Sequence, residues 1–193
     1  MNPIIFIDTE TGGIDPEKHS LLSIGLVAWS MQDGIIGSLE VFIKSNEYIF
    51  TKEAQGLNKF DKEEHEKKAV DPKDALKLIQ AFISKYYNVC KNVEIAGHNT
   101  QFDVAFLKVF FKQNGRSFNQ IFSHRIIDTY SILKFLVDAG VIEGPVAGSG
   151  KAFMYFDIKV QQRHTALSDA VATSKLYEEL LLLLKKKIGE KVM

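Results

Sequence analysis

Residues 3–8, PIIFID, form a near-continuous apolar run that ends in an acid. Successive side chains of a β-strand point to opposite faces of the sheet, so a strand without polar alternation is buried on both faces. We therefore expect this run to be a central strand with other elements packed on both sides of it. Acidic side chains at the end of such a strand then lie at the edge of a core.

The pattern after this strand predicts an α/β fold. Residues 21–30 and 35–44 are strand-like and flank the turn sequence QDG, which is typical of an antiparallel hairpin. Helical and strand patterns then alternate: helix 71–87 with Asp71 as its N-cap, strand 93–97, helix 100–115 closed by a glycine, strand 125–129, helix 130–140 and a long helix over 166–187. This order predicts helices around a mixed sheet, in a single domain over 1–193.

Composition excludes several classes of protein. The 24 Lys and Arg residues balance 24 Asp and Glu residues, so the net charge carries no overall signature of a nucleic-acid binder. Cys90 is the only cysteine, which excludes an intrachain disulfide and suits a reducing compartment. The N-terminus lacks a secretory signal pattern, and no apolar run approaches the ~20 residues of a membrane span. We expect a soluble, cytoplasmic protein.

Asp8 and Glu10 are the first candidate metal ligands. They are two residues apart on a strand, so both carboxylates project from the same face. Two adjacent like charges at the edge of a core are unfavourable unless a cation neutralises them, and Mg²⁺ prefers carboxylate oxygens. Gly12 and Gly13 follow, and we expect their missing side chains to let a ligand approach the turn. Taken alone, the D-x-E pattern is more typical of a solvated strand end than of a metal site.

Two further acids lie on apolar helix faces. Asp103 shares its face with Phe106, Leu107 and Phe110, and Asp169 shares a stripe with Ala172, Leu176 and Leu180. Each falls near the start of its helix, where the helix dipole favours an anion. A capping or salt-bridged carboxylate is the alternative for either residue alone. Convergence of all four acids would hold two cations ~3.5–4 Å apart, an arrangement suited to phosphoryl transfer.

His164 is the candidate general base. It lies five residues before Asp169 in RHTALSDA, and Thr165 is the expected N-cap of the last helix. An imidazole with an ordinary pKa near 6.5 accepts a proton from a metal-activated water at neutral pH. A surface histidine without a role is the alternative reading, and it also applies to His19, His65, His98 and His124.

Three segments, IFIDTETGG, GHNTQFDVAFL and RHTALSDA, resemble in order and spacing the signature segments of the DEDDh 3′–5′ exonucleases. The resemblance covers roughly residues 3–184 and implies a ribonuclease-H-like fold, with a mixed five-stranded sheet flanked by helices. It also implies that two Mg²⁺ ions, with Mn²⁺ as a substitute, bind the metal-binding acids Asp8, Glu10, Asp103 and Asp169, and that His164 is the general base. The sister subgroup has a tyrosine where this chain has Thr165, so the histidine subtype is indicated.

The same resemblance indicates the residues that contact the substrate. Thr11 and Gly12 occupy the place where family members hold the 3′-terminal nucleotide, and Ile14 falls where an apolar residue wedges against the terminal bases. Asn99 and Phe102 frame the site around Asp103, and for Phe102 core packing is as strong a reading as base stacking. Many members have a His-Gly-Ile segment where this chain has GLNKF, which leaves the role of Asn58 open.

These observations predict a metal-dependent 3′–5′ exonuclease that acts on single-stranded nucleic acid, with DNA preferred, and releases nucleoside 5′-monophosphates. Trimming of RNA 3′ ends, as by ribonuclease T or oligoribonuclease, is one alternative. A non-catalytic nucleic-acid-binding or polymerase-associated module is another, and a DNA polymerase is a conceivable partner. The segment GPVAGSGKA departs from the P-loop spacing, which disfavours ATP binding, and the leucine-rich C-terminal helix is expected to pack in the core instead of on a membrane.

Overall fold

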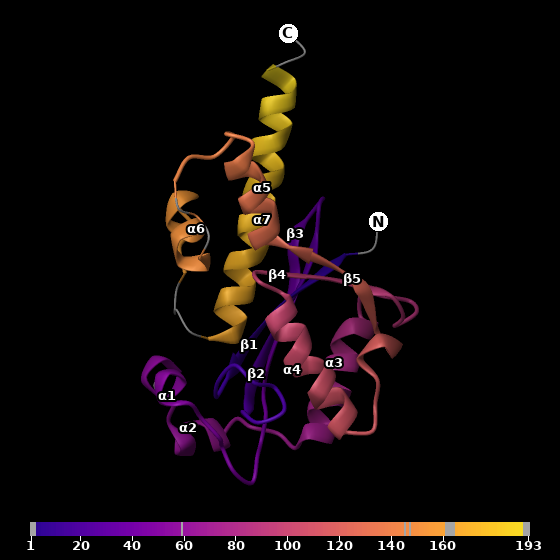
Figure 1. Cartoon of the computed structure of the whole chain (residues 1–193). Helices are drawn as coiled ribbons and strands as arrows, with labels where there is room; N and C mark the ends of the chain where they lie inside the picture. Colours follow the sequence, from indigo (N-terminus) through magenta and orange to yellow (C-terminus); the bar gives the residue numbers. More distant parts are fainter. Residues whose placement is uncertain (1–2, 59, 145, 147, 161–164, 191–193) are drawn as a thin grey trace.

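A five-stranded mixed sheet forms the centre of the protein (Figure 1). The computed structural model describes residues 3–58, 60–144, 146, 148–160 and 165–190. The strand order is β3-β2-β1-β4-β5; the two β1–β2 and β2–β3 pairs are antiparallel, and the β1–β4 and β4–β5 pairs are parallel. The strands span β1 Ile4–Thr11, β2 Leu21–Ser30, β3 Gly34–Phe42, β4 Val93–Gly97 and β5 Phe122–Asp128. The predicted α/β fold with a mixed sheet is confirmed.

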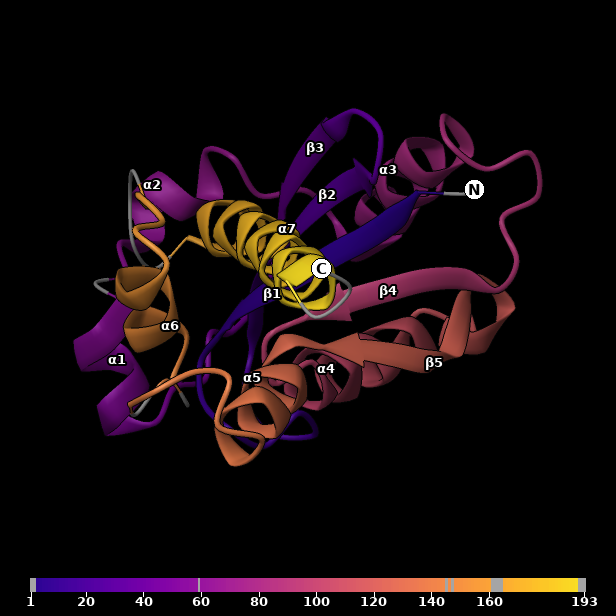
Figure 2. The same ribbon diagram turned by 90° about the horizontal axis from the view of Figure 1, so that it is seen from above.

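The predicted helices are present and cover both faces of the sheet. α3 (Pro72–Ser84) and α4 (Gln101–Gln113) pack their apolar side chains into the main core on one face. α7 (Ala166–Glu190) lies on the other face beside β1 and β2, and Figure 2 looks along its axis. α5 (Thr129–Asp138) packs against α7 on that side. β1, β2 and β3 follow one another as antiparallel neighbours, whereas helices on one face connect β3 to β4 and β4 to β5.

β1 is the central strand, and it is buried on both faces as its apolar run predicts. Ile5 and Ile7 are buried in the core with α3 and α4, whereas Phe6 is buried on the face of α7. The strand continues to Thr11, past the predicted end at residue 8. It does so because a ladder is made by backbone groups, and Glu10 is paired with Ser23 of β2 despite its charge.

Three short helices are not predicted by the sequence pattern: α1 (Lys52–Asn58), α2 (Lys62–Glu66) and α6 (Ser149–Tyr155). α2 is held by specific contacts instead of an apolar stripe. Asp61 Oδ1 accepts the Glu64 N–H at 3.1 Å, and the buried His65 places its Nε2 3.0 Å from the Ile43 carbonyl. This histidine therefore has a structural role.

The predicted helix ends are confirmed in part. Gly115 closes α4 with a φ of +69°, and its N–H donates to the Lys112 carbonyl at 3.1 Å. Asp71 occupies the N-cap position of α3, but its side chain makes no capping hydrogen bond there. Its carbonyl accepts the Ala75 N–H instead, as the first bond of the helix. Asp71 is therefore the N-cap, as predicted, but it caps the helix without a side-chain hydrogen bond.

The leucine-rich part of α7 belongs to the core. Leu176 and Leu180 are buried in a cluster with Leu133 and Leu136 of α5. The predicted core packing of this helix is confirmed. Within the described ranges, no helix is both long enough and apolar enough to cross a membrane.

Candidate metal centre and active site

Three carboxylates converge where the end of β1 meets the start of α7. Asp8, Glu10 and Asp169 each offer one oxygen, and these three oxygens lie within 4.8 Å of one another. The alternation of β1 places Asp8 and Glu10 on the face toward α7, as the two-residue spacing predicts. All three residues are half-buried. The cluster is therefore reachable from solvent, although it stands at the edge of the core.

The start of α7 is fixed against β2 and β3, and this contact places Asp169. A Cβ at Gly25 would overlap the backbone of Ala166, so only glycine permits this approach of helix to strand. The Leu167 N–H donates a hydrogen bond of 3.4 Å to Glu40 Oε1 of β3. Thr165 Oγ1 accepts the Ser168 N–H at 3.2 Å, so the predicted N-cap is confirmed.

This donor set fits a divalent cation. Three carboxylates so close together repel one another, and hard cations such as Mg²⁺ and Mn²⁺ take oxygen ligands of this kind. Half-buried ligands leave open positions for water and a substrate phosphate. A cation would remove the repulsion and polarise a bound phosphate, which is the chemistry needed to cleave a phosphodiester.

Asp103 reaches β1 at a different residue. It is 4% exposed, and its Oδ1 accepts a hydrogen bond of 2.7 Å from the hydroxyl of Thr9, which lies between Asp8 and Glu10. Among the described residues, it does not belong to the cluster in which every oxygen lies within 4.8 Å of the others. The structure thus brings three of the four predicted acids into one cluster and places the fourth beside the same strand.

Burial raises the pKa of Asp103 to about 7, more than the Thr9 hydrogen bond lowers it. The negative charge of Asp128 raises this pKa further. The expectation that the start of the helix favours the anion is therefore wrong for Asp103, because loss of solvation outweighs the helix dipole. A cation beside this carboxyl would favour its ionised form.

This pKa predicts a pH-dependent stability in the presence of EDTA. The unfolded carboxyl has its ordinary pKa of 3.8, whereas the folded one holds its proton to about 7. The stabilisation from this group is thus complete below pH 3.8 and is lost as the pH rises to about 7. Asp103→Asn keeps an acceptor for Thr9 but cannot ionise. Between pH 4.5 and 8, its unfolding free energy should rise relative to wild type by roughly 2–4 kcal/mol, measured by urea unfolding. A difference independent of pH would contradict the raised pKa.

The turn between β4 and α4 is held by a residue that the sequence reasoning missed. Asn99 has a φ of +60°, and its N–H donates to Asp128 Oδ1 at 2.7 Å. Asp128 also caps α5, where it accepts the N–H of Tyr130 at 3.2 Å and the hydroxyl of Ser131 at 2.9 Å. The available signal was an acid at the end of a predicted strand, directly before a helix. Asp128 therefore fixes the turn that begins the helix of Asp103.

The glycines after β1 make room for the protein itself. A Cβ at Gly12 would overlap the Ile49 carbonyl, and one at Gly13 would lie 2.7 Å from the His19 ring and from Thr51. The Gly12 N–H donates to the Ser20 carbonyl at 2.7 Å, within the same loop. The expectation that these glycines leave space for a ligand is therefore wrong at the positions of their missing side chains.

The remaining predicted contact residues differ in their exposure. Thr11 is buried, and its hydroxyl donates to the Gly13 carbonyl at 2.8 Å. Ile14 is 82% exposed, as an apolar wedge requires. Phe102 is half-buried with its ring centre 5.1 Å from that of Phe106, so core packing accounts for part of its surface. Asn58 ends α1, and its side chain is outside the described atoms.

Two predicted histidines have different outcomes. His164 lies outside the described residues, so its role as general base stays a prediction. His98 is half-buried next to the β4–α4 turn, and its Nδ1 lies 3.0 Å from the Thr129 hydroxyl. The same hydroxyl donates to the Gly97 carbonyl at 3.0 Å. Thr129 thus bonds both to the His98 ring and to the backbone at Gly97. His98 therefore helps to hold the turn.

Comparisons with known proteins identify relatives of this chain. A family model described as "Exonuclease" matches residues 5–177. Ribonuclease T of Buchnera aphidicola is 27% identical over 186 residues, which cover 92% of this chain and 81% of that protein. The PolC-type DNA polymerase III of Streptococcus pneumoniae is 25% identical over 190 residues, which cover 97% of this chain and 11% of the polymerase.

Solved structures show the same fold. Exonuclease I of E. coli in complex with a dT13 oligonucleotide matches with a TM-score of 0.81 and 14% identity, over 98% of this chain and 43% of that chain. Cell-death related nuclease 4 matches with a TM-score of 0.77 and 14% identity, over 95% and 64%. The family model covers most of the chain, and metal dependence is general among its members. The predicted family is confirmed: this chain belongs to the exonuclease family, in the DEDD-type group of divalent-metal-dependent 3′–5′ exonucleases.

Proposed function

We propose that this exonuclease hydrolyses the terminal phosphodiester at the 3′ end of single-stranded DNA and releases nucleoside 5′-monophosphates. The observation that carries the proposal is the cluster of Asp8, Glu10 and Asp169 in a chain of the exonuclease family. Phosphate contacts and stacking of the terminal bases dominate binding in such a site, so little sequence preference is expected.

We propose two Mg²⁺ ions as the cofactor, with Mn²⁺ as a substitute. Asp8, Glu10 and Asp169 would hold the first ion, and Asp103, which approaches β1 at Thr9, would contribute to the second. Bound Mg²⁺ lowers the pKa of water and stabilises the charge on the phosphate oxygens. His164 would accept the proton of the attacking water, since a neutral imidazole is a base near pH 7.

The residues around the cluster would orient the 3′ end. The exposed Ile14 offers an apolar surface to the terminal bases, and the half-exposed edge of Phe102 offers a second one. Asn99 presents its exposed side chain from a turn that Asp128 holds in place. Thr11 and Gly12 are the proposed contacts of the terminal nucleotide; the Gly12 N–H already donates to the Ser20 carbonyl, so Gly12 would contact the nucleotide through its carbonyl, which also accepts the Thr51 N–H.

RNA is the second candidate substrate, and the similarity to ribonuclease T supports it. That relative aligns over 81% of its length, whereas the polymerase aligns over 11%. The fold match to a dT13 complex supports DNA. Discrimination between the two depends on contacts with a 2′-hydroxyl.

Matched DNA and RNA oligonucleotides of one sequence, labelled at the 3′ end, test both substrates. Purified protein with Mg²⁺ should release labelled mononucleotide from DNA faster than from RNA, and EDTA should stop the release. An oligonucleotide blocked at its 3′ end with a phosphorothioate linkage is the control for contaminating endonucleases. Faster release from RNA would make RNA trimming the function, and no metal-dependent release from either would exclude the exonuclease.

Metal binding should also stabilise the fold. A ligand that binds only the folded state adds about 2.7 kcal/mol at one hundred times its dissociation constant. For a chain of this size, that corresponds to a rise in Tm of roughly 5–10 °C. Differential scanning fluorimetry with Mg²⁺, Mn²⁺ and EDTA measures this rise, and Glu10→Gln should reduce it. An unchanged Tm at saturating metal would contradict a site formed before substrate binds.

A further inference from the structure

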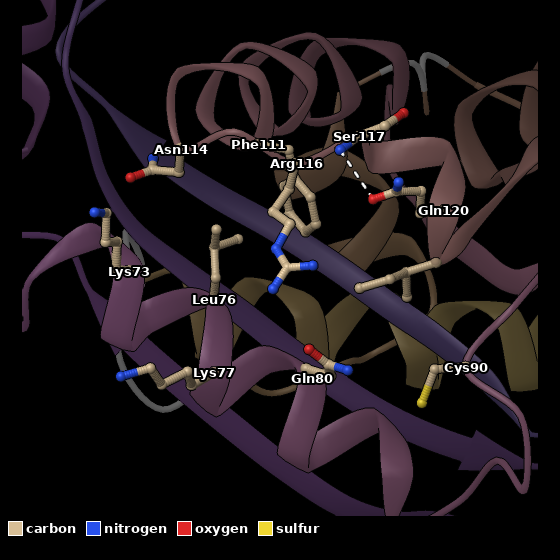
Figure 3. Close-up of a pocket in the computed structure, with 11 residues that line it drawn as sticks. Lys73, Leu76, Lys77, Gln80, Cys90, Phe111, Asn114, Arg116, Ser117 and Gln120 are labelled. Carbon is tan, nitrogen blue, oxygen red and sulfur yellow. Dashed lines mark hydrogen bonds between the residues drawn. The ribbon is translucent and has the colours of Figure 1, made fainter.

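Away from the carboxylate cluster, a cavity of about 420 Å³ lies between α3 and the end of α4 (Figure 3). Lys73 and Lys77 of α3 line one side of it, and Arg116, which follows α4, lines the other. Figure 3 shows the Arg116 side chain extending into the cavity toward Gln80. None of its lining residues is acidic, so the cavity concentrates positive charge in a chain whose net charge is zero. We call it the α3–α4 pocket.

The three cations differ in their ion pairs. Lys77 pairs with Asp74 at 2.7 Å. Within the part of the chain that the structure describes, neither Lys73 nor Arg116 forms an ion pair. Both are exposed, so they remain available to a ligand. Like charges that converge on one cavity attract an anion, and guanidinium groups suit phosphate oxygens in particular.

The rest of the lining suits the remainder of a nucleotide. Leu76 and Ile121, which are half-buried, provide an apolar floor, and Gln80 and Asn114 provide amide groups. Cations that bind a backbone, placed beside apolar surface, suit a single strand, whose sugars and bases cover such a surface. A small inorganic anion would use the cations and leave the apolar floor uncovered.

The α3–α4 pocket lies at the far end of α4, the helix whose first turn carries Asp103. Asn114 lines the α3–α4 pocket and also a neighbouring hollow of about 290 Å³. This hollow runs between α4 and residues 16–21, the loop that follows the exposed Ile14. At 1.5 Å per helical residue, Asn114 lies ~16 Å along α4 from Asp103. A stacked strand that rises ~3.4 Å per nucleotide spans this distance with about five nucleotides, and a stretched one with fewer.

The hollow and the α3–α4 pocket differ in net charge. Lys18 and Lys44 line the intermediate hollow together with Glu17 and Glu47, so its charge is balanced. The α3–α4 pocket therefore provides the first net positive charge that a strand meets on this side of α4.

We propose that the α3–α4 pocket binds the backbone of the same single strand several nucleotides before its 3′ end. Lys73 and Arg116 would contact the phosphates, and the apolar floor would contact a sugar or base. This inference rests on the proposed function, since it takes the 3′ end to lie at the carboxylate cluster. It predicts that the pocket contributes to binding of long substrates and not of very short ones.

The test compares two double variants that each remove two positive charges. Lys73→Gln with Arg116→Gln changes the pocket, and Lys185→Gln with Lys186→Gln changes the exposed end of α7 as a matched control. Fluorescence anisotropy with dT15, labelled at its 5′ end, measures affinity in EDTA against salt concentration. The control should match wild type. Loss of two phosphate contacts should reduce the salt slope by ~1.4, which is about 25-fold weaker binding at 0.1 M salt.

Cleavage separates this proposal from the proposed function. With Mg²⁺, the pocket variant should have a raised KM for dT15, an unchanged kcat and wild-type kinetics on dT3. If wild type and the pocket variant bind dT15 equally, the proposed role of the pocket is wrong. The same holds if the variant loses cleavage efficiency equally on dT3 and dT15. Wild type that binds dT15 with the full salt slope but does not cleave it would overturn the proposed function alone. Arg116→Lys should restore most of the salt slope, because the charge is kept.

Discussion

Asp8→Asn is expected to stop cleavage while the chain stays folded. The residue is half-buried at the end of β1, and its backbone pairing opposite Gly25 does not depend on its side chain. The substitution removes one of three carboxylate charges and so weakens the binding of a cation. Stabilisation of the transition state by metal is worth several kcal/mol, so single-turnover rates should fall by about 10³-fold or more.

The same variant should be more stable than wild type without metal. Asp8, Glu10 and Asp169 repel one another when no cation is present, and removal of one charge relieves this repulsion. The Tm of Asp8→Asn in EDTA should therefore equal or exceed that of wild type, and Mg²⁺ should raise it less. Glu179→Gln is the matched control, since it removes an exposed carboxylate from α7 outside the cluster. Near wild-type turnover of Asp8→Asn with Mg²⁺ would refute the metal assignment.

The fold was predictable where a buried element has a periodic pattern of apolar residues along the sequence. The apolar run of β1 and the helical stripe of α3 both persist over many residues, so periodicity identifies them. α1, α2 and α6 have only 7, 5 and 7 residues, which is too short for a periodic signal. α2 in particular depends on a contact between His65 and Ile43, 22 residues away. Such a contact leaves no trace in the neighbouring sequence.

The site was predictable in its composition and less so in its geometry. Strand alternation alone places Asp8 and Glu10 together, whereas Asp169 joins them because Gly25 lets α7 approach β2. The hydrogen bond from Thr9 to Asp103, and the raised pKa of Asp103, follow from burial, which one sequence does not give. The reason for the two glycines after β1 was also hidden, because Ile49 and Thr51, which leave no room for a side chain there, come from a distant segment.

His164→Ala is expected to lose about 10²–10⁴-fold in rate and to keep its metal binding. General-base catalysis typically contributes a factor of this size, and the four acids remain in the variant. Thermal stabilisation by Mg²⁺ should therefore match that of wild type, which distinguishes this variant from Asp8→Asn. His164→Asn should behave like His164→Ala, because an amide accepts hydrogen bonds but takes up no proton near neutral pH.

The pH profile decides whether His164 is the base. A base must be neutral before the attack, so the wild-type rate should rise with pH through the pKa of the histidine and then level off. Asp103 has a pKa of about 7 without metal, so it would add a second rise in the same range. Saturating Mg²⁺ removes this overlap, because a neighbouring cation keeps the carboxyl ionised well below pH 7. Single-turnover cleavage between about pH 5.5 and 9 at saturating metal should then show one rise in wild type and none in His164→Ala. A His164→Ala enzyme with the wild-type rate and profile would exclude the general-base role and leave the metal site intact.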